Sequence, residues 1–211
     1  MRDCRVKPAA DNRLPEAGEC AAKIGMKSVL VIYGTTEGQT RKVAEFMANA
    51  LRAHSVEIDL VDSAAARAAL VEPVYAAAIV CGSLHLRGYQ ASLLRFVRDN
   101  KTWLAGLPAA FVSVSMTAAL KDDRSRAQLR EIAEAFFRKA DWTPAITQHV
   151  AGALRYTQYG YFKRLIMRLI ARHQGGDTDT SRDHEYTDWD ALTRFVETFL
   201  AAIPLRKGVH N

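Results

Sequence analysis

The stretch "SVLVIYGTTEGQT", Ser28 to Thr40, decides the fold prediction because it joins a buried-type strand to a polar loop. Its first half, Ser28 to Tyr33, is apolar and rich in β-branched residues, as parallel strands buried on both faces are. Its second half leads into a segment from about 40 to 53 whose apolar residues recur at helical spacing. A strand, a loop and a helix in this order predict an α/β sheet covered on both faces.

The same alternation continues along the chain. Further strands are predicted at 56–62, 76–83, 109–115 and 145–154, and further helices near 90–101, 124–139 and 188–202. We therefore expect a doubly wound sheet of five parallel strands in a single α/β domain, residues 26–203. Residues 155–185 are an insertion after the fifth strand, and 204–211 form a C-terminal tail.

The first 25 residues differ from the rest in composition. They mix charges, prolines and glycines without a period, and Met26 opens the apolar run that follows. Such composition is typical of a disordered segment. We expect residues 1–25 to be a disordered extension or the result of a start codon assigned too far upstream.

Charge and cysteine content narrow the range of functions. The net charge is +6 and the isoelectric point about 9.3, which favours an anionic partner: a membrane surface, a nucleic acid or an acidic small molecule. The cysteines Cys4, Cys20 and Cys81 show neither paired nor metal-type spacing, which predicts a reducing compartment without disulfides and no metal site. No apolar run approaches the roughly 20 residues of a membrane-spanning helix.

The loop "GTTEGQT", Gly34 to Thr40, lies where α/β folds bind ligands, at the carboxyl end of a strand. It contains neither a dinucleotide fingerprint nor a Walker motif. Its three threonine hydroxyls, its glycine and the N–H groups of a helix start suit one terminal phosphate. A tight turn with a threonine N-cap is the alternative interpretation.

The loop "SLHLRGYQ", Ser83 to Gln90, follows the third strand. His85 and Tyr89 offer flat faces for stacking, and Arg87 adds a positive charge. Alone, this pattern also fits an ordinary surface loop, but beside a phosphate loop it indicates a flavin mononucleotide (FMN) site. The predicted FMN-binding residues are Thr35, Thr36, Glu37, Gly38, Gln39, Thr40, Ser83, Leu84, His85, Leu86, Arg87, Gly88, Tyr89 and, after the fourth strand, Ser115.

Several motifs resemble one known family. Thr36, Gly38 and Thr40 form the T-x-G-x-T pattern of flavodoxin phosphate loops. The segments "AGALRY" (151–156), "GGDTDT" (175–180) and "YTDWD" (186–190) resemble the flavodoxin-like, menaquinone-dependent protoporphyrinogen IX dehydrogenases of haem biosynthesis. In its second loop the family carries arginine and tyrosine where this chain has His85 and Leu86.

The resemblance implies a flavodoxin-like sheet of order 2-1-3-4-5, bound FMN, and oxidation of protoporphyrinogen IX with electrons passed to a membrane quinone, menaquinone or ubiquinone. A flavodoxin-type electron carrier and an NAD(P)H-quinone reductase are the alternatives. No arrangement of residues suggests a catalytic acid, base or nucleophile, so none is assigned. Known nucleic-acid-binding motifs are absent from the sequence, and no nucleic-acid partner is expected.

The insertion contains the basic amphipathic stretch "YFKRLIMRLIAR", 161–172. As a helix it spans only about 18 Å, too short to cross a hydrocarbon core of about 30 Å. It can pack on the sheet, lie on a membrane or bind a protein partner. We expect Lys163, Arg164 and Arg168 to dock on anionic lipid, which predicts a cytoplasmic protein held peripherally on the inner membrane.

Two residues after the fifth strand are also candidates. Arg155 and Tyr156 either bind a propionate or a quinone oxygen, or anchor the insertion to the sheet. His149, inside the fifth strand, is expected to be a core residue.

Overall fold

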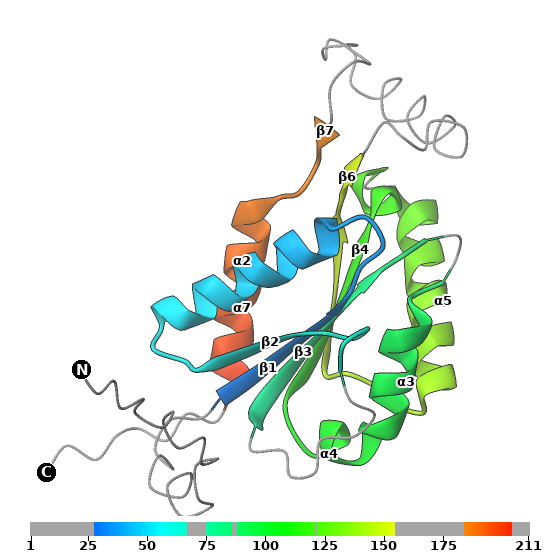
Figure 1. Ribbon diagram of the computed structural model, residues 1–211. Coiled ribbons are helices and arrows are strands. Elements are labelled where there is room, and N and C mark those ends of the chain that lie inside the picture. Colours follow the sequence, from blue (N-terminus) through cyan, green and yellow to red (C-terminus); the bar gives the residue numbers. More distant parts are fainter. Residues whose placement is uncertain (1–27, 67–74, 86–87, 121, 155–183, 204–211) are drawn as a thin grey trace, which may run out of the picture.

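The computed structural model describes residues 28–66, 75–85, 88–120, 122–154 and 184–203, and it is shown in Figure 1. Its centre is a parallel sheet of order β2-β1-β3-β4-β5. The strands are β1 (Ser28–Gly34), β2 (Ile58–Asp62), β3 (Tyr75–Ser83), β4 (Ala109–Ser115) and β5 (Ile146–Ala151). The predicted fold class and strand order are confirmed.

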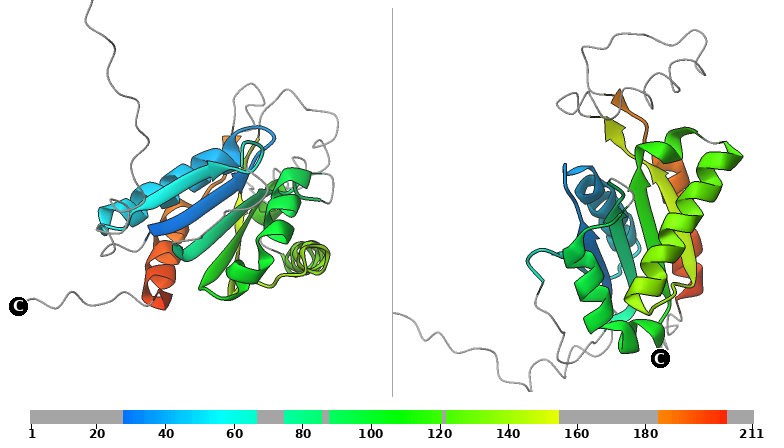
Figure 2. Two further views of the ribbon diagram at one scale, coloured as in Figure 1. Left: turned by 60° about the horizontal axis from the view of Figure 1, so that its bottom comes forward. Right: turned by 90° about the vertical axis from the view of Figure 1, so that its right-hand side faces the viewer.

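Helices cover both faces of this sheet (Figures 1 and 2). On one face lie α2 (Gln39–Ala53) and α7 (Trp189–Ala202), and on the other lie α3 (Ala91–Asp99), α4 (Lys101–Ala105) and α5 (Asp123–Ala140). Alternate residues of β1 enter the two cores: Val29 and Val31 face α2, whereas Leu30 and Ile32 face α3. The continuous apolar run of β1 is thus explained by burial on both sides.

The predicted helix 90–101 is two helices in the structure, α3 and α4, with Asn100 between them. The buried Asn100 side chain donates from Nδ2 to the carbonyl oxygen of Phe96 at 2.8 Å and accepts from Trp103 Nε1 at 2.9 Å. The backbone N–H of Asn100 also donates to the Phe96 carbonyl at 3.1 Å, so the side chain adds to the backbone bond at this point.

The predicted strand 145–154 was too long. The fifth strand of the sheet ends at Ala151, and the chain turns at Gly152, whose N–H donates to the Ser115 carbonyl at 3.1 Å. Beyond it, β6 (Ala153–Leu154) pairs antiparallel with β7 (His184–Glu185) in a separate small sheet. The two ends of the insertion therefore lie side by side, whereas residues 155–183 lie outside the described chain.

A short 3-10 helix, η1 (Met116–Leu120), follows β4 and precedes α5. It lies at the carboxyl end of the sheet, where Gly152 bonds to Ser115 at the end of β4. Among the described residues, no helix is long and apolar enough to cross a membrane.

Candidate functional site

Loops from four strands meet at the carboxyl ends of the sheet. A small cavity there is lined by Thr36, Glu37 and Gln39 after β1, Ser83, Leu84 and His85 after β3, Ser115 and Met116 after β4, and Gly152 and Ala153 after β5. Seven of the predicted site residues thus line one cavity, although they lie between Thr36 and Ser115 in the sequence. This is the crevice in which parallel α/β folds bind ligands.

The loop after β1 is shaped around Gly38, the residue that precedes α2. Its φ of 89° lies in the left-handed region that favours glycine, and its N–H donates to Thr35 Oγ1 at 2.9 Å. The first turn of α2 carries no acidic residue and receives no side-chain cap. The helix start therefore leaves backbone N–H groups for an anion, favoured by the helix dipole.

Thr40 supplies the test of whether a phosphate fits here. The residue is 1% exposed, and its hydroxyl oxygen has no hydrogen-bond partner among the described residues. A buried hydroxyl without a partner is costly, and a phosphate oxygen at the start of α2 would satisfy it. Glu37 lines the cavity, and its Oε1 is buried without a partner among the described residues. Because a carboxylate repels a phosphate, only the backbone N–H of Glu37 could serve the anion. The first loop thus fits a single phosphate group.

Gln90 is a site residue that the sequence analysis missed. Its Nε2 donates to Thr36 Oγ1 at 3.0 Å and to the Ser83 carbonyl oxygen at 3.1 Å, and its Oε1 accepts from the Ser83 N–H at 3.2 Å. It thereby joins the loop after β1 to the loop after β3. No local pattern marks a glutamine before a helix for such a role, so only the fold reveals it.

Gln39 and Ser115 use their side chains within the protein. Gln39 Nε2 donates to Glu185 Oε1 at 2.9 Å and to Thr187 Oγ1 at 3.0 Å, which ties the first loop to the chain that returns from the insertion. Ser115 is buried, and its hydroxyl accepts from the Ala118 N–H at 3.3 Å. The group that Gln39 could offer to a ligand is its backbone N–H, because it is the first residue of α2.

The second loop differs from its prediction at Tyr89. Its ring packs edge-on against Phe111 and Phe136, and its hydroxyl donates to Ser113 Oγ at 2.8 Å. Burial raises its pKa to about 12. The expected stacking face of Tyr89 is therefore used in the protein core, because the neighbouring Gly82 leaves room for the ring.

His85 remains the aromatic side chain of this loop that lines the cavity. Its N–H and carbonyl exchange hydrogen bonds with Gly88 at 3.0 and 2.9 Å, which closes a tight turn. The predicted contacts of Leu86 and Arg87 lie outside the described residues, as do those of Arg155, Tyr156, Lys163, Arg164 and Arg168.

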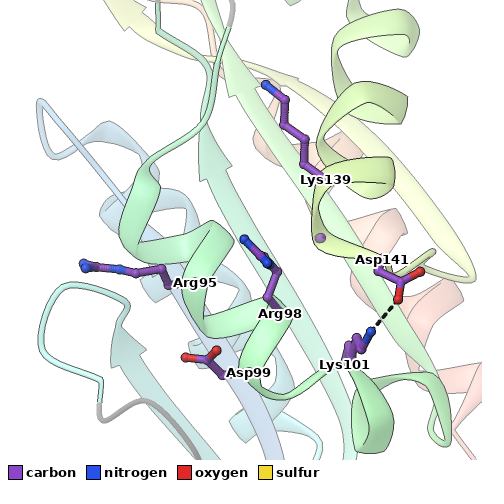
Figure 3. Close-up of a pocket in the computed structure, with 7 residues that line it drawn as sticks. Arg95, Arg98, Asp99, Lys101, Lys139 and Asp141 are labelled. Atoms are coloured by element: carbon purple, nitrogen blue, oxygen red, sulfur yellow. Dashed lines mark hydrogen bonds and ion pairs between the residues drawn. The ribbon is translucent and has the colours of Figure 1, made fainter.

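A second group of charged side chains lies at the opposite end of the sheet. Figure 3 shows Arg95, Arg98, Asp99, Lys101, Lys139 and Asp141 around a cavity between the ends of α3 and α5. Lys101 and Asp141 form an exposed ion pair, which lowers the pKa of Asp141. Because α3 and α5 run back from the ligand crevice, this cluster is separate from the site.

Comparison with known proteins places the chain in a family. The model of the family described as flavodoxin domain matches residues 30–181. The chain is 31% identical over 177 residues to a protoporphyrinogen IX dehydrogenase (quinone) of Leishmania major, covering 83% of this chain and 75% of that protein. It is 30% identical over 170 residues to the protein of that name from Escherichia coli K12, covering 79% and 91%.

Among solved structures, oxidised flavodoxin 1 of Bacillus cereus superposes with a TM-score of 0.51 at 14% identity, covering 84% of this chain and 99% of that one. This likeness supports the fold. The chain therefore belongs to the flavodoxin domain family, and within it to the family of the quinone-dependent protoporphyrinogen IX dehydrogenases.

Proposed function

We propose that this protein binds FMN and oxidises protoporphyrinogen IX to protoporphyrin IX in haem biosynthesis, with a membrane quinone as the electron acceptor. The observation that carries the proposal is its relationship to curated dehydrogenases of that name in a bacterium and a protozoan, over 79% and 83% of this chain. The described crevice supports it, because its first loop fits one phosphate group and lacks the motifs of dinucleotide sites.

The residues that would hold FMN follow from the geometry. Thr36 and Thr40, with the backbone N–H groups of Gln39 and Thr40 at the start of α2, would bind the phosphate. Ser83, Leu84 and His85 on one side and Ser115 and Met116 on the other would border the ring system. Gln90 would hold both loops in place through its bonds to Thr36 and Ser83.

The task left to the chain is to bind and orient the cofactor and the substrates. The redox chemistry would be supplied by bound FMN, a cofactor able to accept an electron pair from an organic donor and transfer it to a quinone. The buried thiol of Cys81 stays protonated, because burial raises its pKa. It therefore offers no thiolate for nucleophilic chemistry. Positioning of the porphyrinogen against the flavin is then the task of the crevice.

Substrate binding is proposed for residues outside the described chain. Protoporphyrinogen IX carries propionates, and Arg87, Arg155 and Tyr156 follow strands whose carboxyl ends border the crevice. Guanidinium groups bind carboxylates in bidentate fashion, which suits Arg87 and Arg155 to this role.

Membrane association is proposed for the stretch 161–172. We infer that Lys163, Arg164 and Arg168 dock the protein on anionic lipid at the cytoplasmic face of the inner membrane, where the quinone, menaquinone or ubiquinone, resides. Replacing all three residues by glutamate should abolish co-sedimentation with anionic vesicles and leave FMN bound. Unchanged vesicle binding of this triple variant would refute the docking role.

Acceptor and donor specificity test the proposed reaction. FMN-loaded protein is assayed anaerobically for protoporphyrin fluorescence, with protoporphyrinogen IX and with or without a naphthoquinone. Product should form only with quinone. In a parallel assay NADPH replaces the porphyrinogen and the reduction of the naphthoquinone is followed. Quinone reduction at an equal rate with NADPH would identify a nicotinamide-dependent quinone reductase. If neither protoporphyrinogen IX nor NADPH supports quinone reduction, the electron-carrier alternative is favoured.

A further inference from the structure

A larger cavity of about 610 Å³ runs along the outer edge of the sheet. β5 is the edge strand of the described sheet, and its consecutive residues Thr147 to Ala151 all line the cavity. Its other walls are η1 and α5 on one side and the start of α7 on the other, and Figure 2 shows β5 between the two helices. This volume lies in the usual range of small-molecule sites.

The edge cavity adjoins the FMN crevice. Thr117, Ala118 and Ala119 of η1 line the edge cavity, and the two preceding residues, Ser115 and Met116, line the crevice. On the neighbouring strand, Ala151 lines the edge cavity, whereas the next two residues, Gly152 and Ala153, line the crevice. The two spaces therefore share the same two pieces of chain as walls. A ring in the edge cavity would lie next to the flavin site.

His149 gives the cavity a hydrogen-bond donor. His149 lines the cavity, and its Nδ1 is buried without a partner among the described residues, which leaves Nε2 as the ring nitrogen that can reach a ligand there. Burial, and then the positive charge of Arg130, lower the pKa of His149. The ring is thus neutral at physiological pH. A buried N–H without a partner is rarer than an unfilled acceptor, which favours the proton on Nε2.

The other residues that line the edge cavity indicate whether its ligand is charged or neutral. The charged residues that line the cavity, Arg126 and Asp188, have opposite signs, and Arg126 also lies 3.8 Å from the Asp123 carboxylate. Asp188 also accepts from the Ala191 N–H at 2.8 Å, as the cap of α7. A porphyrinogen with two propionates or a nicotinamide dinucleotide with two phosphates gains no net attraction here. Apolar walls from Leu129, Val150 and Leu192 favour a neutral ring instead.

We propose that the edge cavity binds the ring of the quinone acceptor, with a quinone oxygen accepting a hydrogen bond from His149 Nε2. This inference rests on the proposed function and names the site of its second substrate. Reduction of a quinone to its hydroquinone consumes an electron pair and two protons. Each oxidation step of the porphyrinogen releases the same, so electrons and protons balance. Porphyrinogen and quinone then approach the flavin from different sides.

The test measures quinone binding without the porphyrinogen. FMN-loaded protein is reduced with dithionite under anaerobic conditions and mixed with a naphthoquinone that lacks its isoprenoid tail. The rate of flavin reoxidation is followed against quinone concentration. For the unaltered protein the rate should saturate. A strictly linear dependence would contradict a binding site and overturn the inference.

Two substitutions at His149 test the hydrogen bond. His149→Phe keeps a flat ring but removes the donor, and the half-saturating quinone concentration should rise about fivefold, the effect of one hydrogen bond. His149→Gln places an amide N–H near the position of Nε2 and should stay within about twofold of the unaltered protein. Equal half-saturation in both variants and the unaltered protein would overturn the role of His149.

A matched pair of substitutions on α7 tests whether the quinone binds in the edge cavity. Ala191 lines the edge cavity, whereas Ala201 is exposed near the far end of the same helix. Ala191→Trp should fill the cavity and raise half-saturation at least tenfold, or remove saturation, while Ala201→Trp should match the unaltered protein. FMN content and thermal unfolding establish that each variant is folded. Normal saturation in folded Ala191→Trp would place the quinone elsewhere.

Failures of the two proposals give different results. If protoporphyrinogen IX fails to reduce the flavin, the proposed function is wrong, but saturable reoxidation by quinone still supports this site. If porphyrinogen reduces the flavin while quinone reoxidation is linear or insensitive to these variants, the proposed function stands and the edge cavity is not the quinone site.

Discussion

Gln90 donates a hydrogen bond of 3.0 Å from Nε2 to Thr36 Oγ1, so the start of α3 holds the loop that follows β1. The same amide exchanges hydrogen bonds with the backbone of Ser83. One side chain thus fixes the spacing of two loops before any ligand arrives. Such preorganisation lowers the entropic cost of binding.

Gln90→Ala should therefore weaken FMN binding. Each lost hydrogen bond is worth about 1 kcal/mol, and part of the loss falls on the free protein, so we expect Kd for FMN to rise about tenfold. Fluorescence titration of the apoprotein with FMN measures this change. Gln128→Ala, at an exposed position of α5, is the matched control and should leave Kd unchanged.

Thr40→Val should affect binding and stability in opposite ways. The hydroxyl has no described partner in the protein, so its loss should leave the unfolding free energy of the apoprotein unchanged or higher. A hydrogen bond to a charged phosphate is worth about 1.5–3 kcal/mol, which predicts a rise of roughly tenfold or more in Kd for FMN. Thr40→Ser should bind normally. A normal Kd in the valine variant would show that Thr40 does not contact the phosphate.

Gly82→Ala should destabilise the protein through the Tyr89 ring. A Cβ at Gly82 would lie 2.6 Å from Tyr89 Cδ1, and overpacking of this kind costs about 1–3 kcal/mol. Gly88→Ala is the control, since a Cβ there meets nothing within 4 Å. Urea unfolding compares the two variants. Equal stability would mean that the ring of Tyr89 is free to move out of the core.

His149 predicts a loss of stability at acidic pH. Its pKa in the folded protein lies below the ordinary value of 6.5, so the unfolded chain binds a proton that the folded chain does not. Its full contribution to the unfolding free energy is present above pH 6.5 and is lost as the pH falls through that value towards the folded pKa. His149→Gln should give a shallower fall in stability between about pH 7 and pH 5. Parallel curves for both proteins would contradict the lowered pKa.

The sheet was predictable because burial on both faces leaves a strong signal in the sequence. β1 and β4 are mostly apolar, and the order of strands followed from the family resemblance. The end of β5 was harder to predict. After Gly152 the chain enters a second, antiparallel pairing, in which Ala153 lies opposite Glu185 and Leu154 opposite His184, and such a distant partner leaves no local signal. Between α3 and α4, the Asn100 side chain bonds to Phe96 on one side and Trp103 on the other, and no periodicity reveals these contacts.

The candidate site was predictable where local chemistry decides it. Gly38 and Thr40 carry the signature of an anion site within a few residues of chain. Tyr89 and Gln90 could not be assigned correctly, because their roles depend on residues from other strands: Phe111 and Ser113 for the ring, Thr36 for the amide. The orientation of such side chains is set by packing between elements.

The most direct test of the proposed reaction is a single anaerobic turnover. FMN-loaded protein is mixed with protoporphyrinogen IX in the absence of any acceptor, and the visible absorbance of the flavin is recorded together with protoporphyrin fluorescence. We predict that the flavin bleaches as it accepts an electron pair from the porphyrinogen and that its colour returns when a naphthoquinone is added. A flavin that stays oxidised in the presence of excess protoporphyrinogen IX would contradict this prediction.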